Sequence, residues 1–412
     1  MDIEEEERIK ALNRYIKGDK PSIICKDAGK SEKWLFKWVN RFKTGEEEWY
    51  KSKSRAPKKH GRRTDKEMES TVVNVRNALM EGNEHESKYL GISADAIQYR
   101  LEKHGFSREE MPSVSTIKRI VKKHGLIVNK RERYKRVKSK KRYTILNPTR
   151  IDEMHQMDFV GPRFIKGYGA ISSLNLIDVV SNQVHIEQYD TRSMDNIIGF
   201  LIRFWRNNAI PRYLQLDNGM YFIGDFKYPR RFCRFLRFCL YVGVEVVFIN
   251  PKCPWMNGSI ENFNGWFEAK FWDKEKFTSL EDMRAKSTHF VDQYNDLSAW
   301  KNKNKSLEHI NPTRILNKSL EISQDKLPLT DGKIHFIRKV NNEGDISVLN
   351  EAFEVGKEFI DEYVWATICL KKQRIGVYYR AKDQDATILI KKFEYELKEE
   401  VKALRPEICK TL

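Results

Sequence analysis

Hydrophobic residues recur every three to four positions through the first third of the chain, which is the spacing of one buried helix face. Residues 4–43 are therefore expected to form three helices, and Gly18 and Gly29 mark the ends of the first two. The third helix has an apolar face made by Trp34, Leu35, Trp38, Val39 and Phe42. The pattern predicts a small helical domain over residues 1–50.

The opposite face of this third helix is basic, with Lys33, Lys37 and Arg41 in successive turns. A short helix, a turn that contains glycine and a basic helix are typical of a helix-turn-helix DNA-binding domain. A three-helix bundle whose basic face is merely solvated fits the same pattern. The first domain alone leaves both interpretations open.

A second helical unit is expected over residues 65–128, after a basic linker at residues 51–64. Its last helix, in SVSTIKRIVKKHG, turns Ile117, Ile120 and Val121 inward. The exposed side of that helix carries Thr116, Lys118, Arg119 and Lys122. Two tandem helix-turn-helix candidates joined by a basic segment favour DNA binding over two unrelated solvated bundles.

The stretch NKRERYKRVKSKKR has nine Lys and Arg among its fourteen residues and a single acid. Like charges at this density oppose compact packing, so residues 129–148 are expected to form a basic arm that follows DNA phosphates. The candidate DNA contacts of the arm are Lys130, Arg131, Arg133, Lys135 and Arg136. A linker that serves only solubility is the alternative.

From residue 149 onward the pattern changes to β-branched and apolar runs separated by turn residues. Three strands, a helix, a strand, a helix, a strand and a final helix predict a mixed sheet flanked by helices over residues 149–280. A helix-rich linker is expected at residues 281–328. Alternating runs over residues 329–412 predict a small antiparallel barrel, so the chain should be a multidomain α+β protein.

The net charge of +18 changes this picture because it is concentrated at the front of the chain. Residues 1–150 hold 38 Lys and Arg against 22 Asp and Glu, whereas residues 151–320 hold 22 against 19 and residues 321–412 hold 16 against 17. A basic front end on a nearly neutral body is typical of nucleic-acid binding. The six cysteines are scattered, and the first residues are acidic without an apolar leader, so we expect a cytoplasmic, nucleoid-associated protein.

Three acids stand where strands should end or a helix should begin. Asp158 lies in the strand-like run HQMDFVGP, Asp217 ends LQLD, and Glu261 opens a helix after PKCPWMNGS. They would share one crevice at a sheet edge if the first and fourth strands are neighbours. Three close carboxylates repel one another unless cations neutralise them, and oxygen ligands suit Mg²⁺ or Mn²⁺. Two such ions can clamp a phosphodiester, so the acids predict phosphoryl transfer on DNA.

Other polar residues near these acids receive structural interpretations. Asp178 is expected to end a strand and accept a turn amide, and His155 to be a hydrogen-bonded neighbour of the sheet. Asn257, with Gly258, is interpreted mainly as the turn that starts the Glu261 helix, and a contact to DNA is the lesser alternative.

The motifs MDFVGP, LQLDNG and PKCPWMNGSIENFNGWF resemble the DDE motifs of bacterial insertion-sequence transposases of the retroviral-integrase superfamily. The front-end segments WVNRFKTGEEEW and STIKRIVKKHGL also resemble that group. The resemblance implies an RNase H-like integrase core in which Asp158, Asp217 and Glu261 are the catalytic triad and bind two Mg²⁺ or Mn²⁺ ions. It also implies that the C-terminal β-domain is SH3-like.

The same resemblance implies a reaction and its partners. A transposase of this kind binds the terminal inverted repeats of a mobile element as double-stranded DNA, cleaves there, and joins the 3′-hydroxyl ends to target DNA. A homodimer or larger oligomer would hold the paired ends. Two alternatives stay open: a non-transposing nuclease of the same fold, and a DNA-binding regulator whose integrase core is inactive.

The sequence departs from the family pattern in two places. Asp217 and Glu261 are separated by 43 residues, more than the family usually has, and the surplus is expected in the loop at residues 222–231. Relatives often carry Lys or Arg two helical turns after the glutamate, but Glu268 stands there, and the nearest basic residue, a candidate DNA contact, is Lys270.

Overall fold

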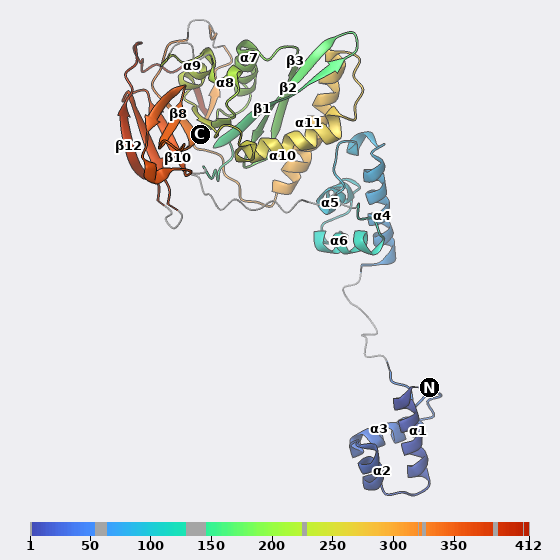
Figure 1. The fold of residues 1–412 in the computed structure, drawn as a ribbon. Coiled ribbons are helices and arrows are strands. Elements are labelled where there is room, and N and C mark those ends of the chain that lie inside the picture. The colour runs from blue at the N-terminus through green and yellow to red at the C-terminus, as the bar shows by residue number, and fades with distance from the viewer. Residues whose placement is uncertain are drawn as a thin grey trace. The chain divides into compact units, whose positions relative to one another are not determined.

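The computed structural model divides into two compact units, residues 1–64 and 65–412, and each is described by itself (Figure 1). The residues described are 2–53, 64–128, 146–224, 229–319, 321–323, 327–381, 386–406 and 408–411. Most of the predicted basic linker therefore lies outside the described residues. The same holds for all five candidate contacts of the predicted basic arm, Lys130, Arg131, Arg133, Lys135 and Arg136.

The first unit contains the three predicted helices. They are α1 (Ile3–Ile16), α2 (Pro21–Ala28) and α3 (Glu32–Lys43). Gly29 ends α2 in the left-handed region at φ 61°, and the Ser31 hydroxyl caps α3 by accepting the Trp34 N–H. Leu35 and Val39 of α3 pack against α1 and α2, whereas Phe42, which was expected on the same face, is exposed.

The second helical unit is part of the larger compact unit. It comprises α4 (Lys66–Glu81), the short η1 (His85–Ser87), α5 (Ala94–Lys103) and α6 (Val114–Lys123). Side chains of Asp65, Ser93 and Ser113 cap the three α-helices. Ile117, Ile120 and Val121 of α6 are buried as predicted. The helix-turn-helix interpretation of both helical units stays a prediction.

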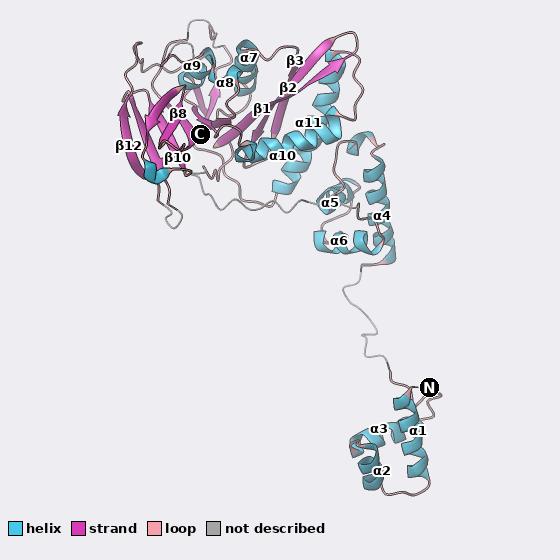
Figure 2. Ribbon diagram, in the orientation of Figure 1, coloured by secondary structure: helices cyan, strands magenta, loops and turns pink. Residues whose placement is uncertain are grey.

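The core of the larger unit is a mixed sheet, which confirms the predicted α+β class (Figure 2). Its first strands are β1 (Met154–Ile165), β2 (Gly169–Asp178), β3 (Val184–Tyr189), β4 (Tyr213–Leu216) and β5 (Glu245–Phe248). β1, β2 and β3 form an antiparallel meander, and β4 and β5 continue the sheet in parallel from the other edge of β1.

Helices cover both faces of this sheet (Figure 1). They are α7 (Met194–Trp205), α8 (Met220–Ile223), α9 (Arg234–Tyr241), α10 (Gly258–Phe267), the π-helical η3 (Glu268–Trp272) and α11 (Leu280–Asn302). Side chains of β2 alternate between the two faces of the sheet. Leu174 and Leu176 pack with α7 and α9 on one face, and Ile171 and Ile177 pack with α10 and α11 on the other.

The C-terminal strands correct the prediction of a separate small barrel over residues 329–412. They are β7 (Lys333–Lys339), β10 (Tyr363–Cys369), β11 (Arg374–Tyr379) and β12 (Ile388–Glu394). β7 pairs in parallel with β5, so the described strands join into one sheet of order β12-β11-β10-β7-β5-β4-β1-β2-β3. The local alternating pattern indicated strands correctly but could not reveal this long-range pairing.

Two small ribbons complete the C-terminal part. β8 (Asp345–Val348) pairs with β9 (Glu351–Glu354), and β6 (Thr313–Leu316) pairs with β13 (Ile408–Thr411). The predicted linker at residues 281–328 thus holds both the long helix α11 and the strand β6. Within the described part of the chain, no helix is long and apolar enough to cross a membrane.

Candidate active site

Asp158 and Asp217 lie at the same level on two neighbouring strands. β1 and β4 run in parallel, and Gln156 of β1 pairs with Gln215 of β4. Asp158 stands two residues after Gln156 within β1, and Asp217 stands two residues after Gln215, directly after the last residue of β4. The parallel register therefore brings the two aspartates to the same level. The first and fourth strands are thus neighbours, which was the condition for the two aspartates to share one crevice.

Glu261 lies in the first turn of α10, and the start of that helix is bonded to the same two strands. The Gln156 Oε1 atom accepts the N–H groups of Ser259 and Ile260, at 3.0 Å each. The Gln215 Nε2 atom donates to the Met256 carbonyl at 2.9 Å and to the Asn257 side chain at 3.3 Å. Both glutamines are buried, at 5% exposure.

Sequence reasoning missed these two glutamines. In HQMD and LQLD each glutamine stands two residues before the aspartate, and therefore on the same face of its strand. A polar residue at an inward position of a strand next to a candidate catalytic acid is the pattern that could have revealed them. Their buried amides need partners, and the start of α10 supplies those partners.

A chain of amide and hydroxyl groups orients Asp158. The Asn264 Nδ2 atom, one helical turn after Glu261, donates to the Asp158 carboxylate at 3.1 Å. Asn264 in turn accepts from Asn175 at 2.9 Å, and Asn175 accepts from the Ser173 hydroxyl at 2.7 Å. The other Asp158 oxygen accepts its neighbour's backbone N–H, so the carboxylate orientation is set by both β1 and α10.

Asp217 is supported from the C-terminal strands. The Gly219 N–H donates to its carboxylate at 3.0 Å, which fixes the turn after β4. The neighbouring Asn218 accepts from Arg338 of β7 at 2.8 Å and donates to the Ile249 carbonyl at 2.6 Å. Burial lowers the pKa of Arg338 to about 10, and its guanidinium bonds only carbonyl and amide oxygens in the described structure.

The three carboxyl groups influence one another electrostatically. Burial, followed by the charge of Asp217 and then of Glu261, raises the pKa of Asp158 to about 7. Burial raises the pKa of Asp217, and burial together with Asp217 and Glu268 raises the pKa of Glu261. Among the described residues none of the three carboxylates has an ion-pair partner. The charge of Arg192 opposes the rise for both aspartates but does not cancel it. An oxygen-only cluster of this kind fits hard divalent cations.

The carboxylates are nevertheless not gathered as tightly as a closed metal site. In the described part of the chain, the group of three potential ligands whose atoms all lie within 4.8 Å of one another is Asp152, His155 and Asp178. The triad of Asp158, Asp217 and Glu261 is wider than that limit.

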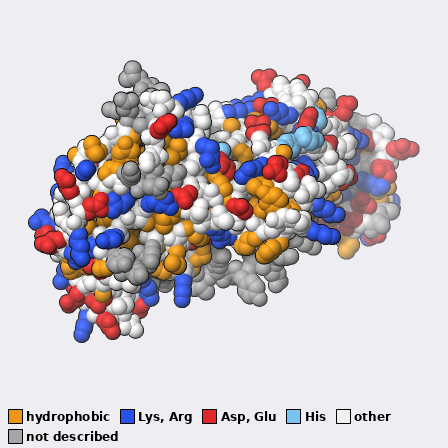
Figure 3. Space-filling view, turned by 90° about the horizontal axis from the view of Figure 1, so that it is seen from above, with side chains coloured by type: hydrophobic (Ala, Val, Ile, Leu, Met, Phe, Trp, Pro, Cys, Tyr) orange, Lys and Arg blue, Asp and Glu red, His pale blue; other side chains and the backbone are white. Residues whose placement is uncertain are grey.

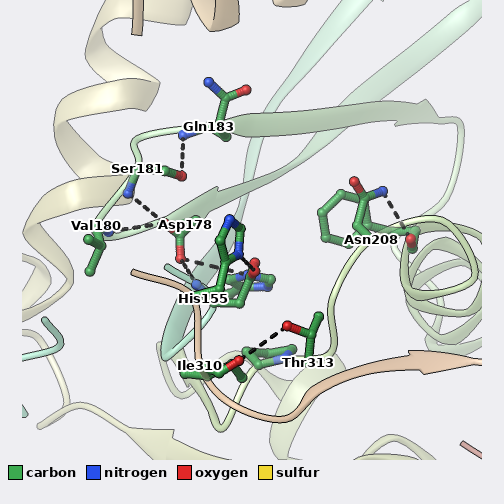
Figure 4. Close-up of polar contacts among 12 residues, drawn as sticks. His155, Asp178, Val180, Ser181, Gln183, Asn208, Ile310 and Thr313 are labelled. Atoms are coloured by element: carbon green, nitrogen blue, oxygen red, sulfur yellow. Dashed lines mark hydrogen bonds and ion pairs between the residues drawn. The ribbon is translucent and has the colours of Figure 1, made fainter. Parts of the chain in front are cut away.

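The cluster of Asp152, His155 and Asp178 is occupied by protein groups, and Figure 4 shows His155 and Asp178 among their polar contacts. It joins the start of β1, the turn after β2 and His309, whose Nδ1 atom lies 3.1 Å from Asp152. Asp178 accepts the N–H groups of Val180 at 3.2 Å and Ser181 at 2.6 Å, and its second oxygen accepts the Asp152 N–H at 2.9 Å. Asp152 also contacts the His155 Nε2 atom at 3.3 Å. Asp178 thus accepts turn amides as predicted, and His155 is a bonded neighbour of the sheet whose Nδ1 atom lacks a partner.

The candidate DNA contacts on α3 and α6 are mostly open to solvent. Lys33 and Lys37 are exposed, whereas Arg41 pairs with Glu46 at 2.9 Å and also bonds the Lys51 carbonyl. On α6, Thr116 is half-buried, and the exposed residues are Lys118, Arg119 and Lys122. On the face in Figure 3, Lys and Arg side chains are interspersed with acidic and hydrophobic ones.

Two other candidate DNA contacts are less accessible. Asn257 is buried at 2% exposure and accepts from Gln215, so its turn-forming interpretation is favoured over contact with DNA. Lys270 is half-buried, with its Nζ atom 5.6 Å from the centre of the Trp266 ring. Glu268 is exposed at the point where α10 changes to the π-helical η3.

The long interval between Asp217 and Glu261 contains α8, α9 and β5. In the stretch between Ile223 and Arg234, the described positions form no helix or strand, and residues 225–228 lie outside the described part. The additional residues expected between Asp217 and Glu261 can therefore lie in this connection between α8 and α9 without displacing β4 or α10.

Comparison with known proteins identifies one domain family. Residues 242–297, which include β5, all of α10 with Glu261, and most of α11, match the model of the integrase core domain. The chain is 27% identical over 203 residues to the insertion element IS476 uncharacterized 39.2 kDa protein of Xanthomonas euvesicatoria. That match covers 47% of this chain and 54% of the relative, so the chain spans about half the length of the curated relative it matches.

A solved structure of a retroviral complex also aligns with the chain. It is the simian T-cell lymphotropic virus intasome in complex with PP2A regulatory subunit B56 gamma, with 13% identity and a TM-score of 0.28. The alignment covers 74% of this chain and 94% of that chain, but so low a TM-score does not establish a common fold. The integrase core domain match is thus confined to residues 242–297, and the partly covered relative is a protein of an insertion element.

Proposed function

We propose that the protein is a DDE-type DNA transposase. Asp158, Asp217 and Glu261 would form its catalytic centre, which cleaves the ends of a mobile element and joins them to target DNA. The observation that carries this proposal is the level placement of the two aspartates on adjacent parallel strands, with the Glu261 helix bonded to those strands. The sheet order, an antiparallel meander followed by parallel strands with helices on both faces, supports an RNase H-like core.

Asp158, Asp217 and Glu261 would hold two Mg²⁺ or Mn²⁺ ions. When bound, such ions stabilise the charge that develops on the attacking and leaving oxygens of a phosphodiester. The all-oxygen donor set, the raised pKa values and the lack of described ion-pair partners support this role.

The surrounding residues would orient the three acids. Asn264 fixes one oxygen of Asp158, and the paired glutamines fix the start of α10 relative to both strands. A catalytic group that is already oriented loses little freedom when the substrate arrives, which lowers the barrier to reaction. Asn218, held by Arg338, would do the same for the Asp217 turn.

The basic front end would bind double-stranded DNA at the element ends. Lys33 and Lys37 of α3, and Lys118, Arg119 and Lys122 of α6, have the exposure that such contacts require. Phosphate contacts would supply affinity, and groove contacts from a recognition helix would supply sequence specificity. Paired ends would require a dimer or a larger oligomer.

The decisive experiment uses DNA that carries the sequences flanking the coding region. The full-length protein with Mg²⁺ or Mn²⁺ should nick this DNA at the element ends and join the 3′-hydroxyls to a second duplex. Cleavage without joining would support the non-transposing nuclease, and binding without cleavage would support the inactive regulator.

A further inference from the structure

The second helical unit and the catalytic core share their hydrophobic interiors. Tyr89, which follows η1, is 3% exposed and packs edge-on against Phe271 of η3 and Phe290 of α11. In the opposite direction, Leu297 and Trp300 of α11 pack into the interior formed by α4, α5 and α6. Each part therefore completes the core of the other, and separating them would expose apolar surface on both.

Polar contacts fix the same interface. The Tyr89 hydroxyl donates to Glu275 at 3.0 Å, and the Tyr89 N–H donates to Gln293 of α11 at 3.0 Å. At the other end, Glu102 of α5 accepts from the Trp300 indole at 2.8 Å and pairs with Lys303 at 2.6 Å. These bonds connect the segment before α5 to Glu275 and α11, and the last turn of α5 to the end of α11.

The catalytic helix itself touches the second helical unit. Trp266 of α10 lies directly against Gly91, where an added Cβ would stand 2.3 Å from the tryptophan ring. Trp266 is five residues after Glu261 on the same helix. A side chain at position 91 would collide with the tryptophan ring, so glycine suits this close approach. The helix α10 therefore carries Glu261 of the candidate centre and also contacts the second helical unit.

The helix α6 belongs to the same rigid part. Its buried Ile117, Ile120 and Val121 pack with Ile97 and Leu101 of α5 in one cluster, which also contains Leu297 of α11. Its exposed face, with Lys118 and Arg119, is therefore connected to the Glu261 helix through these packed side chains and the contact of Gly91 with Trp266.

We infer that the second helical unit is a spacer of fixed length, so that the DNA position bound by α6 determines which phosphodiester the same chain cuts. This inference rests on the proposed function, because it requires both DNA binding by α6 and strand cleavage. The first unit, which forms a separate compact unit, would then add affinity without setting the cut position.

The test measures the distance between binding and cutting. Duplexes that carry the element ends are footprinted with the wild-type protein and with the Lys118→Glu, Arg119→Glu variant. The protection that only the wild type gives marks the α6 binding position, and the cut position is mapped on the same duplexes. One to five base pairs are then inserted between the two. The cut should shift by the inserted number and stay at constant spacing from the footprint. A cut that stays at the original terminal base would overturn the inference.

Matched variants test whether the interface holds the spacing. Glu102→Gln with Tyr89→Phe weakens both polar ends of the interface and should spread cleavage over neighbouring phosphodiesters, with at least a severalfold loss at the main position. Glu109→Gln makes the same charge change on an exposed residue of the same unit and should leave the pattern unchanged. Equal patterns in the two variants would contradict the role of the interface.

A DNA-free measurement separates this inference from the proposed function. Spin labels on genetically encoded keto residues at Lys122 and Glu268 report the distance between α6 and the catalytic helix. A single narrow distribution is expected in the full chain. A broad distribution would overturn the spacer whether or not the protein cuts DNA, and a narrow one with no cutting would count against the proposed chemistry alone.

Discussion

Gln156 and Gln215 face each other at paired positions of β1 and β4, and both bond the residues that begin α10. One side chain accepts backbone N–H groups of the helix, and the other donates to the turn before it. The two strands that carry the aspartates thereby also hold the helix that carries Glu261. The geometry of the candidate centre depends on this pair as much as on the acids.

Replacing Gln156 by Ala should impair cleavage more than folding. The change removes the acceptor of two N–H groups, which costs about 1–3 kcal/mol of the free energy of unfolding where those groups stay buried. We expect a lowered Tm, and a drop in the cleavage rate that persists at temperatures where the variant is fully folded. Gln156→Glu keeps an acceptor at this position and should restore most of the Tm. A variant with lowered Tm but unchanged cleavage rate would contradict the positioning role.

Asp158→Asn and Asp217→Asn should each abolish strand cleavage and joining while leaving DNA binding intact. Metal-ion catalysis contributes several kcal/mol, so a loss of roughly 100-fold or more is expected. Gel-shift and nicking assays on the same DNA separate the two properties. Ca²⁺ should support binding with little turnover, because catalysis requires the tighter and more regular coordination of Mg²⁺. Cleavage that persists in EDTA would end the two-metal proposal.

The third ligand is tested by comparing two glutamates on one helix. Glu261→Gln should be inactive. Glu268→Gln should stay active, because Glu268 lies about two helical turns away from the start of α10 that is bonded to both strands. Removing the Glu268 charge should also lower the pKa of Glu261, which that charge raises. Nicking assays over a pH series measure both effects. An active Glu261→Gln with an inactive Glu268→Gln would mean that the triad is assigned wrongly.

Stability without divalent cations should fall as pH rises towards 8. The pKa of Asp158 is about 7 in the folded protein against 3.8 for the unperturbed group, so the folded state binds more protons between these values. The associated stability is fully present below about pH 4 and is lost as pH rises through 7. Mg²⁺ or Mn²⁺ should therefore raise the Tm more at pH 8 than at pH 5. Asp158→Asn should remove most of this pH dependence. If Mg²⁺ raised the Tm equally at pH 5 and pH 8, the raised pKa of Asp158 would not be the cause of the pH-dependent stability.

Charge reversal on α6 should reduce sequence-specific binding. Lys118→Glu with Arg119→Glu should weaken binding to element-end DNA more than to random DNA, because recognition-helix contacts carry specificity. Lys33→Glu with Lys37→Glu on α3 provides the comparison in the first unit. Fluorescence anisotropy at several salt concentrations measures both. Equal losses on specific and random DNA from the α6 variant would remove its assignment as the recognition helix.

Two of the three acids could be predicted from the sequence because they mark a local boundary, whereas Asp158, expected at the end of its strand, lies inside the longer strand β1. Asp217 follows a short apolar run, and Glu261 follows a turn, so both positions are readable from their immediate neighbours. Gln156 and Gln215 could not be found this way, because their partners come from a turn about 40 or 100 residues away and their pairing depends on strand register.

The same limit explains the C-terminal correction. The strands from β7 onward were expected from alternation, but the pairing of β7 with β5 joins residues far apart in the chain. The contact of Tyr89 with η3 and α11 was likewise hidden, because a short apolar run such as Tyr89 to Ile92 does not indicate which surface it fills. Local pattern predicts elements well and their neighbours poorly.

The β5–β7 pairing also determines what a shortened chain would expose. A protein that ended before Lys333 would leave β5 as a bare edge strand, and such edges recruit other chains and promote aggregation. It would also lose Arg338, the donor to Asn218 beside Asp217. Truncated copies should therefore be removed by precipitation or proteolysis and should not persist as DNA-bound competitors of the intact protein.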